Sequence, residues 1–391
     1  MKRHEVSQEW SETSLKKMAK IIMGQSPDSS TYNQDGEGFV FLQGNADFGA
    51  TNPRSNMFCS SPKKIAKKGN ILISVRAPVG DLNIADKDYC IGRGVAAFEA
   101  GKEIDSIFLY YALFLSRQYL FRVMQGTTFE AVNKTDLERI IVSKPAATEV
   151  QRKIAAILLT IDKAIEKTQA LIDKNEKIKQ GLMGDLLNPE KRPNNWKEKR
   201  ITEISDIISG STPKTSVLNY WNGSIVWITP EDLSENDSIY MKTSSRKMSE
   251  KGLKNCSAQI IPKNSIVMSS RAPIGYLAIM KVDYSTNQGC KSFRLKDVNP
   301  EFIYYLLKYN MQNIRQMGEG TTFSEISKTQ IEKIKLVLPE STKEQEKIAS
   351  ILLKADDKIY LEQMYLNKLA KMKSGLMQDL LTGKVRVKVA A

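Results

Sequence analysis

The chain has 391 residues, of which 41% are hydrophobic and 26% charged, and its formal net charge is +14 at pH 7. This composition is typical of a globular protein, and the longest apolar runs are too short to span a bilayer. The only histidine, His4, cannot supply a histidine-dependent hydrolytic triad or a multi-histidine metal site. The positive charge is spread along the chain and favours a polyanion such as nucleic acid, although acidic proteins or a membrane surface would attract it as well.

The four cysteines, Cys59, Cys90, Cys256 and Cys290, are far apart and include no CxxC pair. This spacing argues against a zinc site or a disulfide framework and fits a reducing compartment. The first residues, "MKRHEVSQEWSE", contain no apolar core of a secretory signal. We therefore expect a cytoplasmic protein with free thiols and no membrane association.

The first part of the chain alternates short β-rich runs with Gly, Pro, Asn and Ser. "FVFLQ" at 39–43 and "NILISV" at 70–75 are typical of strands, and residues 104–124 have helical periodicity. Residues 1–145 are therefore predicted to form a globular α+β domain.

Residues 146–187 are predicted to form one long helix, because apolar residues recur at helical spacing from Ile154 onward. Thr148 is the expected N-cap. A helix of about 40 residues is roughly 60 Å long, too long to bury its apolar stripe against one small domain. It therefore requires a partner helix. Residues 188–195 are predicted to be a linker.

The second part of the chain has the same organisation. Strands are predicted at 223–229 and 264–270 and a helix at 300–317, so residues 196–339 should form a second α+β domain. Residues 340–391 are predicted to contain a second long helix, with Thr342 as its N-cap, and a tail.

The clearest pattern in the sequence is an internal repeat. "RAPVG" at 76–80 returns as "RAPIG" at 271–275, and the surrounding residues 71–100 and 266–295 share 12 of 30 positions at an offset of 195. Such self-similarity over a long period indicates a duplicated structural unit.

The repeat extends to the end of each copy. "GTTF" occurs from Gly126 and from Gly320, and "GLMGDLL" from Gly181 returns as "GLMQDLL" from Gly375. A net insertion of nine residues falls between Pro213 and Arg271 in the second copy. The predicted fold class is therefore α+β, with two tandem globular domains, each followed by a long helix. The two helices are expected to pair as an antiparallel coiled coil with pseudo-twofold symmetry.

Motifs for catalysis are missing from the sequence. It has no Pro-Pro dipeptide or FxGxG, which amino-methyltransferases need, and no GxxxxGK[ST] phosphate loop. It has no ExK tripeptide, and its only DxK, Asp356-Asp357-Lys358, lies on a predicted helix rather than in a nuclease site. We therefore predict a non-catalytic protein with no bound cofactor or metal.

Recognition residues are more plausible than catalytic ones. Lysines cluster within 61–70 and in the corresponding part of the second copy, where they could contact phosphates, although a single lysine is more often a solvated side chain. Polar residues in the divergent segments 25–60 and 212–260 could contact base edges. The RAPxG arginines could bind a phosphate or a carboxylate, or the motif could only close a hairpin, since proline fixes φ and glycine permits a tight turn. The candidate DNA-contact residues are Lys63, Lys64, Lys67, Lys68, Arg76, Thr127, Thr128, Lys134, Lys214, Arg246, Lys247, Arg271, Thr321, Thr322 and Lys328.

With two variable α+β heads, "RAPxG" and "GTTF" in each, and a long helix ending in "GLMxDLL" after each head, the chain resembles the specificity (S) subunit of type I restriction-modification enzymes. The resemblance covers nearly the whole chain. It implies that the heads are target-recognition domains, each recognising one half of a bipartite, asymmetric DNA target, while the helices set the unrecognised spacer. It also implies two methyltransferase (modification) subunits and two restriction subunits as partners, which carry the methyl donor and ATP.

Two other functions remain open from the residues alone. A stand-alone two-headed DNA-binding regulator would have the same heads without a methyltransferase partner. A coiled-coil scaffold would carry its basic charge incidentally and would bind no DNA. The recognised bases, the spacer length and the oligomeric state of the isolated chain do not follow from the sequence.

Overall fold

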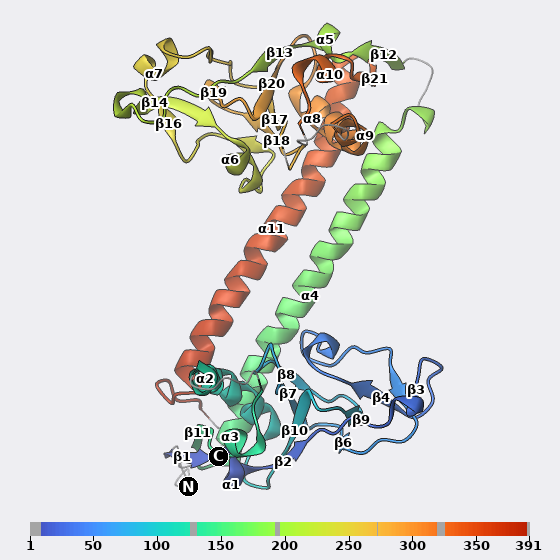
Figure 1. Ribbon diagram of the computed structural model, residues 1–391, viewed down its shortest axis with the longest axis vertical. Helices are drawn as coiled ribbons and strands as arrows, with labels where there is room; N and C mark the ends of the chain where they lie inside the picture. The colour runs from blue at the N-terminus through green and yellow to red at the C-terminus, as the bar shows by residue number, and fades with distance from the viewer. Residues whose placement is uncertain (1–8, 126–130, 192–195, 272, 319–324, 389–391) are drawn as a thin grey trace, which may run out of the picture. The chain divides into compact units, whose positions relative to one another are not determined.

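The computed structural model of the chain describes residues 9–125, 131–191, 196–271, 273–318 and 325–388. These residues divide into two compact units (Figure 1). Unit 1 contains the residues up to Gln169 together with those from Met364 onward, and unit 2 contains Ala170–Gln363. Each unit therefore combines one globular head with parts of both long helices.

The strands of unit 1 form three sheets. A two-stranded sheet pairs β1 with β11, a four-stranded sheet has the order β2-β10-β7-β8, and a five-stranded sheet has the order β3-β5-β4-β9-β6. The strands are β1 (Trp10–Ser14), β2 (Ala19–Met23), β3 (Tyr32–Asn33), β4 (Phe39–Leu42), β5 (Phe58–Cys59), β6 (Ile65–Ala66), β7 (Ile71–Ser74), β8 (Leu82–Ile84), β9 (Tyr89–Ile91), β10 (Val95–Ala100) and β11 (Ile141–Pro145). The helices of this head are α1 (Leu15–Met18), α2 (Ser106–Gln125) and α3 (Lys134–Glu138).

The four-stranded sheet, here called the frame sheet, separates two hydrophobic cores. Side chains alternate along a strand, so Ile71 and Ile73 of β7 enter the core that contains Phe108 of α2, while Leu72 enters the other core. The second core also contains Val40, from the five-stranded sheet, here called the outer sheet. This double burial explains why β7 is a continuous apolar run.

Unit 2 has a frame sheet with a closely related strand order. Its frame sheet is β13-β20-β17-β18-β15, its outer sheet is β16-β14-β19, and β12 pairs with β21. The strands are β12 (Trp196–Arg200), β13 (Ser205–Ser209), β14 (Trp221–Ile228), β15 (Tyr240–Met241), β16 (Lys247–Met248), β17 (Ile266–Ser269), β18 (Leu277–Met280), β19 (Tyr284–Thr286), β20 (Cys290–Leu295) and β21 (Lys335–Pro339). The helices of this head are α5 (Ile201–Ile204), α6 (Pro230–Ser234), α7 (Glu250–Lys254), α8 (Pro300–Tyr309), α9 (Met311–Gln316) and α10 (Lys328–Glu332).

The internal repeat is visible strand by strand. In each frame sheet the central pair is antiparallel, and Phe98 opposite Ile71 in unit 1 corresponds to Phe293 opposite Ile266 in unit 2. Each outer sheet contains one parallel pair, β4 with β9 and β14 with β19. Unit 2 differs because β15, which lies in the region of the predicted insertion, adds a parallel strand to β18.

The two long helices are α4 (Thr148–Leu187) and α11 (Thr342–Leu380), and they lie side by side in each unit (Figure 1). Within unit 1, Ile154 and Leu380 share one core and Asp162 pairs with Lys373, so the residue numbers rise along one helix and fall along the other. Within unit 2, Leu187 shares a core with Ile348 in the same antiparallel sense. The predicted pairing of long helices is thus confirmed within each unit.

Two local predictions need correction, and a third lies partly outside the described residues. The carbonyls of Ala147 and Ser341 accept the first helical hydrogen bonds, so Thr148 and Thr342 are the first residues inside their helices rather than N-caps. The helix predicted over 300–317 is interrupted at Asn310, whose side-chain amide donates to the carbonyl of Leu306 at 2.8 Å. In the predicted linker, residues 192–195 lie outside the described ones.

Among the described residues, no helix has the combined length and apolar character that crossing a membrane requires. All four cysteines are free: Cys59, Cys90 and Cys290 are buried and Cys256 is half-buried. Burial raises the pKa of Cys90 and of Cys290 to about 12, because a thiolate would lose its hydration there. These thiols are unreactive parts of the cores.

Candidate nucleic-acid interface

The RAPxG motif forms the turn between the two antiparallel strands of a hairpin, β7–β8 in unit 1 and β17–β18 in unit 2. In unit 1 the buried Ser74 hydroxyl donates to the carbonyl of Pro78 at 2.8 Å, and the Gly80 amide donates to the Ser74 carbonyl at 2.9 Å. Ser269 makes the same bond to Pro273 at 2.9 Å. A buried serine therefore holds each turn from within, and the motif does close a hairpin.

The arginine of each motif points away from this internal network and is exposed. Arg76 forms an isolated bridge with Ala131, and Arg271 forms the equivalent bridge with Glu325. The Arg271 guanidinium also donates to the Glu325 carboxylate at 3.0 Å, whereas the residue opposite Arg76 carries no charge. The two arginines therefore differ: the one in unit 2 is tied to a carboxylate at this bridge, and the one in unit 1 is not.

The segments that follow the two GTTF motifs are hydrogen-bonded to the residues just before these arginines. Val132 donates to the carbonyl of Val75, and Ile326 donates to that of Ser270. The four threonines of the two GTTF motifs, Thr127, Thr128, Thr321 and Thr322, lie outside the described residues.

Two of the predicted lysines occupy equivalent places just beyond these segments. Lys134 and Lys328 are the first residues of α3 and α10, and each lies 3.8 Å from a glutamate one turn further along, Glu138 or Glu332. Both lysines are about half exposed, so the long pairs leave their ammonium groups accessible to a second anion.

A cleft of about 600 Å³ opens in unit 1 where the frame sheet meets the outer sheet. Three cationic side chains line it: Lys63 precedes β6, Arg76 follows β7, and Arg93 lies in the turn between β9 and β10. Its remaining lining is mostly polar, with two aromatic rings, and consists of Ser26, Pro27, Asp28, Ser29, Tyr32, Phe41, Gln43 and Gly94. The three cations come from separate chain segments that only the fold brings together.

One carboxylate, Asp28, faces these cations. Its oxygen accepts from the Ser30 amide at 3.0 Å and from the Ser30 hydroxyl at 2.7 Å, and these bonds hold the pKa of Asp28 below its ordinary value. Asp28 therefore stays ionised near neutral pH and offsets one of three positive charges. The cleft keeps a net positive charge, which suits an anion with additional hydrogen-bonding groups.

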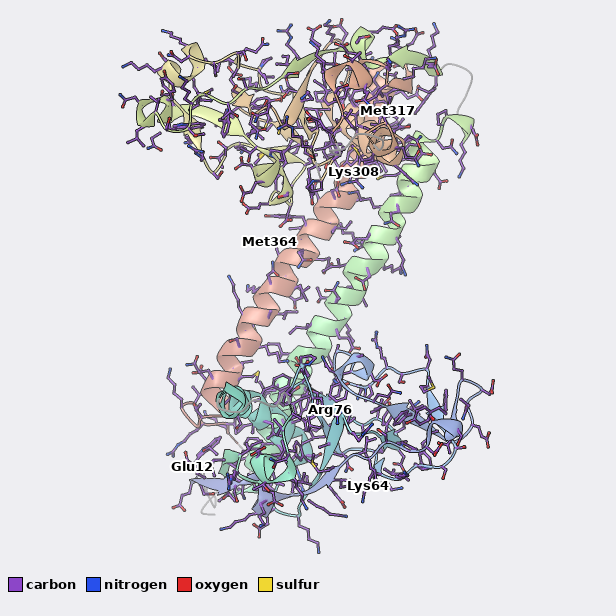
Figure 2. The ribbon with its side chains drawn as sticks, viewed as in Figure 1. Glu12, Lys64, Arg76, Lys308, Met317 and Met364 are labelled. Carbon is purple, nitrogen blue, oxygen red and sulfur yellow. The ribbon has the colours of Figure 1, made fainter. Side chains whose placement is uncertain are left out.

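The other lysines of the 61–70 cluster have different surroundings. Lys64 is exposed (Figure 2). Lys67 pairs with Asp88 at 2.7 Å, and the Lys68 backbone amide donates to the same carboxylate at 2.9 Å. In unit 2 the Lys263 amide donates to Asp283 in the same way, so this aspartate belongs to the repeated frame. The charge of Lys67 is thus already partly neutralised, while Lys64 and the Lys68 side chain remain exposed.

Two segments that carry the predicted residues Lys214, Arg246 and Lys247 of unit 2 are hydrogen-bonded to Trp227 of β14. The Trp227 indole donates to the carbonyl of Ser211 at 3.1 Å, and the Trp227 amide donates to the Ser244 hydroxyl at 3.0 Å. These bonds bring the segment before Lys214 and the segment before Arg246 to the same strand.

Arg246 stacks on a second tryptophan. Its guanidinium carbon lies 3.8 Å from the ring centroid of Trp221, whose ring packs edge-on against Trp227 at 4.9 Å. Stacking of this kind holds the guanidinium in place while its N–H groups stay available for hydrogen bonds. Lys214 and the neighbouring Lys247 are exposed.

Two cationic residues next to the repeated turns, Arg93 and Lys291, were not among the predicted ones. Arg93, which lines the cleft, corresponds to Gln288 in the second copy. Lys291 of β20 is only 6% exposed and donates to the Ser270 hydroxyl at 3.3 Å and to the Gln288 carbonyl at 3.1 Å. Burial lowers the pKa of Lys291. Arg93 lies next to Gly94, and Lys291 lies two residues after Gly289, the equivalent glycine of the second copy. Comparing the residues around this glycine in the two copies would have singled out both cations.

The two units thus present unlike polar, cationic surfaces on one repeated frame, which is the architecture of a two-headed recognition protein. A sequence model of the type I restriction modification DNA specificity domain matches residues 7–177 and 193–371. Because these two matches cover most of the chain, the protein belongs to the family of type I restriction-modification specificity subunits.

Individual relatives agree with this assignment. The chain is 41% identical over 172 residues to the type I restriction enzyme MjaIX specificity subunit of Methanocaldococcus jannaschii, a match that covers 43% of this chain and 40% of that protein. This chain therefore spans less than half the length of that relative. The MjaVIII specificity subunit of the same organism is 25% identical over 342 residues, covering 79% of this chain and 77% of that one.

Solved structures share the fold. The S subunit of a type I restriction-modification system from M. genitalium superposes with a TM-score of 0.65, at 19% identity, over 97% of both chains. A chain from a structure of type I restriction-modification complex assembly superposes with a TM-score of 0.60, at 17% identity, over 97% of this chain and 99% of that one. At these identities the likeness concerns the fold.

Proposed function

We propose that this chain is the sequence-specific DNA-recognition subunit of a type I restriction-modification complex, in which each head recognises one half of a bipartite target. The observation that carries the proposal is the contrast within the repeat. Both units share the order of four frame strands, a RAPxG turn after the third of them, and the hydrogen bond of Ser74 or Ser269 inside that turn, whereas the cationic residues beside them differ. Two unlike surfaces on one frame suit two unlike half-sites.

In unit 1 the DNA-contact surface centres on the cleft. Arg76, Arg93 and Lys63 converge on it from three segments, so they can neutralise a backbone phosphate or form a bidentate pair with a guanine edge. Lys64, Lys68 and Lys134 add exposed charge around it. Lys67, held by Asp88, should contribute least.

In unit 2 the DNA-contact surface centres on the tryptophan pair. Arg246, fixed over Trp221, is the base-contact candidate, and Lys214 and Lys247 are candidates for phosphates. Arg271, already bound to Glu325, and Lys328 are the candidates for phosphate contacts beside the turn. The threonines of both GTTF motifs remain candidates for phosphate contacts on sequence grounds alone.

Two methyltransferase subunits are proposed as partners because an apolar feature of the long helices is duplicated. Leu171 and Ile178 of α4, in unit 2, are 46% and 47% exposed, and their repeat equivalents Tyr365 and Met372 of α11, in unit 1, are 51% and 47% exposed. Residues seven apart lie on one face of a helix. Exposed apolar pairs at equivalent positions suit two copies of one partner.

The remaining parts of the proposal concern chemistry and location. The chain itself is non-catalytic, and the methyl donor and ATP belong to the methyltransferase and to two restriction subunits. The complex acts on double-stranded DNA in the cytoplasm. The motifs missing from the sequence support this division of labour.

The test is reconstitution. The purified chain alone should neither methylate nor cleave DNA, and addition of a type I methyltransferase subunit from the same genome should give methylation at one bipartite, asymmetric sequence. Methylation by the chain alone would refute the non-catalytic role. Sequence-specific binding by the chain with no methyltransferase in any purified complex would favour the regulator instead.

The docking surface can be tested separately. Native mass spectrometry of the wild-type complex should show two methyltransferase copies for each chain. Leu171→Asp or Tyr365→Asp should leave one copy, and the double variant should leave none. The exposed residue Leu218, changed to Asp, serves as the control, since it is 81% exposed in a different part of unit 2. Retention of two copies in the double variant would contradict this surface.

A further inference from the structure

A partly buried polar junction joins three helical segments in unit 1. The Asp162 carboxylate on α4 accepts a hydrogen bond from the Tyr111 hydroxyl of α2 at 2.7 Å and an ion pair from Lys373 of α11 at 2.6 Å. The Lys373 ammonium also lies 5.8 Å from the centre of the Tyr111 ring and 5.5 Å from that of Phe114. One carboxylate therefore connects the head helix with both long helices.

Unit 2 contains the same junction. The Asp356 carboxylate on α11 accepts from the Tyr305 hydroxyl of α8 at 2.6 Å and pairs with Lys179 of α4. Lys179 lies 5.8 Å from the centre of the Tyr305 ring. A further lysine, Lys308 (Figure 2), stands at the sequence position equivalent to Phe114 of unit 1, and its side chain is exposed.

The two junctions are equivalent in the repeat, but in each one the aspartate comes from one copy and the lysine from the other. Asp162 corresponds to Asp356, and Lys179 corresponds to Lys373, at an offset of 194 residues. Each aspartate comes from the first half of its own helix and pairs with the lysine from the second half of the other helix. A junction therefore forms only when copy 1 and copy 2 are aligned antiparallel in one register.

The apolar stripes alone define this register weakly. Apolar side chains recur every three to four residues, so two long helices can slip by a turn, about 5.4 Å, and still bury apolar surface. A single aspartate–lysine pair cannot tolerate such a slip, because the contact would be lost and a partly buried charge left unpaired. The tyrosines extend the constraint to the heads, since Tyr111 and Tyr305 are fully buried and their rings cannot follow a displaced carboxylate.

We infer that these Tyr–Asp–Lys junctions are positioning elements that fix each head on the helix pair in one register and so restrict the complex to one DNA spacer length. This role rests on the proposed function in DNA recognition. One base pair adds about 3.4 Å along the duplex, less than one helical turn of slip. Register errors of a turn would therefore change which spacer the two heads can span.

The test uses the full chain assembled with its methyltransferase. Duplexes carry both half-sites with the native spacer or with one base pair more or fewer, and the initial rate of methylation is compared. Tyr111→Phe and Tyr305→Phe remove only the hydroxyl, and Asp162→Asn keeps the size of the side chain. We expect these variants to recognise the same half-sites but to methylate the altered spacers about tenfold faster, relative to the native spacer, than wild type does.

Two controls separate the junction from general destabilisation. Lys335→Met removes an ion pair of similar length, 2.7 Å to Glu198, which is exposed and lies away from the long helices, and it should leave spacer selectivity unchanged. Lys373→Arg keeps the charge and should retain more selectivity than Lys373→Met. A merely structural role would lower stability in all weakened variants without changing the ratio of rates.

The outcomes distinguish two kinds of failure. If wild type is selective and both tyrosine variants and Asp162→Asn are equally selective, the junctions do not set the spacer. If the wild-type complex methylates no bipartite sequence, the proposed function fails and the role of the junctions fails with it.

Discussion

The inner and outer parts of the two heads differ in how closely they repeat. The frame sheets keep one strand order, β2-β10-β7-β8 in unit 1 and β13-β20-β17-β18 in unit 2, and pack on the long helices through equivalent residues. The outer sheets keep their parallel pair and one antiparallel contact beside it, Ala66 with Tyr89 and Ile261 with Tyr284, but they differ in strand number and in the cationic residues around that pair.

This difference shows why some residues are the same in both copies of the repeat and others are not. A frame residue such as Phe98 contacts a sheet, a head helix and the long-helix core, so a change of volume disturbs packing in every direction. A residue such as Arg93 borders an open cleft, and the frame tolerates glutamine at the equivalent position. Packing therefore preserves the inner part, whereas the outer part can vary with the ligand.

The largest expected effect tests the equivalence of the two frames. Phe98→Ala and Phe293→Ala each remove a fully buried ring, and each should lower the free energy of unfolding of its own unit by about 3–5 kcal/mol. Urea unfolding followed by hydrogen exchange would assign the loss to a unit. A cost in one unit below about half that in the other would show that the frames are not energetically equivalent.

A pair of glycines contrasts the inner part with the outer part. Gly275 of the RAPIG turn has φ near +98°, and an added Cβ would collide with Met311; Gly36 in unit 1 has φ near +88° but open space around it. Gly275→Ala should therefore cost about 2–4 kcal/mol, and Gly36→Ala about 1 kcal/mol. Equal losses in denaturant melts would mean that the close contact at Gly275 relaxes.

Recognition should depend on residues that differ between the heads. Arg93→Gln gives unit 1 the residue that unit 2 has at position 288. We expect the complex to bind its DNA about tenfold more weakly, with altered preference in one half-site only, because a cation leaves the cleft. Fluorescence anisotropy on a set of duplexes with single base changes would measure this.

The matched control for that experiment is Lys20→Gln, which also removes one positive charge from unit 1. Lys20 pairs with Glu99 on the frame sheet and does not line the cleft. Equal weakening by both variants would mean that only the total charge matters.

The smallest effect concerns acid stability. The pKa of Asp88 is lowered below its ordinary value of 3.8, first by its bond to the Lys67 side chain and then by the Lys68 amide. Because the folded pKa lies below the unfolded one, Asp88 stabilises the protein above about pH 3.8, and this contribution is lost as the pH falls through the folded pKa. Asp88→Asn should make the fall in melting temperature shallower between about pH 5 and pH 3. An unchanged dependence of melting temperature on pH would mean that Asp88 does not contribute to the loss of stability in acid.

The fold followed from the sequence wherever burial is periodic. The predicted strands at 39–43, 70–75, 223–229 and 264–270 correspond to β4, β7, β14 and β17, and the long helices begin within a residue of the predicted caps. These elements bury regular stripes, which a one-dimensional pattern records. The parallel pairing of β4 with β9 was not predictable, because both are short and about 50 residues apart.

The polar contacts could be predicted only in part. Charged residues on an amphipathic helix usually face solvent, so Asp162 and Lys373 gave no sign of pairing until both helices were aligned antiparallel. Lys63 and Arg76 were predicted, but Arg93 was missed because the three meet only through the fold. The proposed contacts of the GTTF threonines stay a prediction.

The composition of unit 1 has a consequence for the order of folding. Its core includes Leu380, the last residue of α11, and Leu381 and Val387 from beyond that helix. Gly383 lies so close to Trp10 that a Cβ there would be 2.6 Å from the indole nitrogen. Unit 2, in contrast, is one continuous segment. During synthesis, unit 2 can therefore complete its core first, while the head made first must wait for the last residues of its own unit. The N-terminal head should be the last to become resistant to protease on the ribosome.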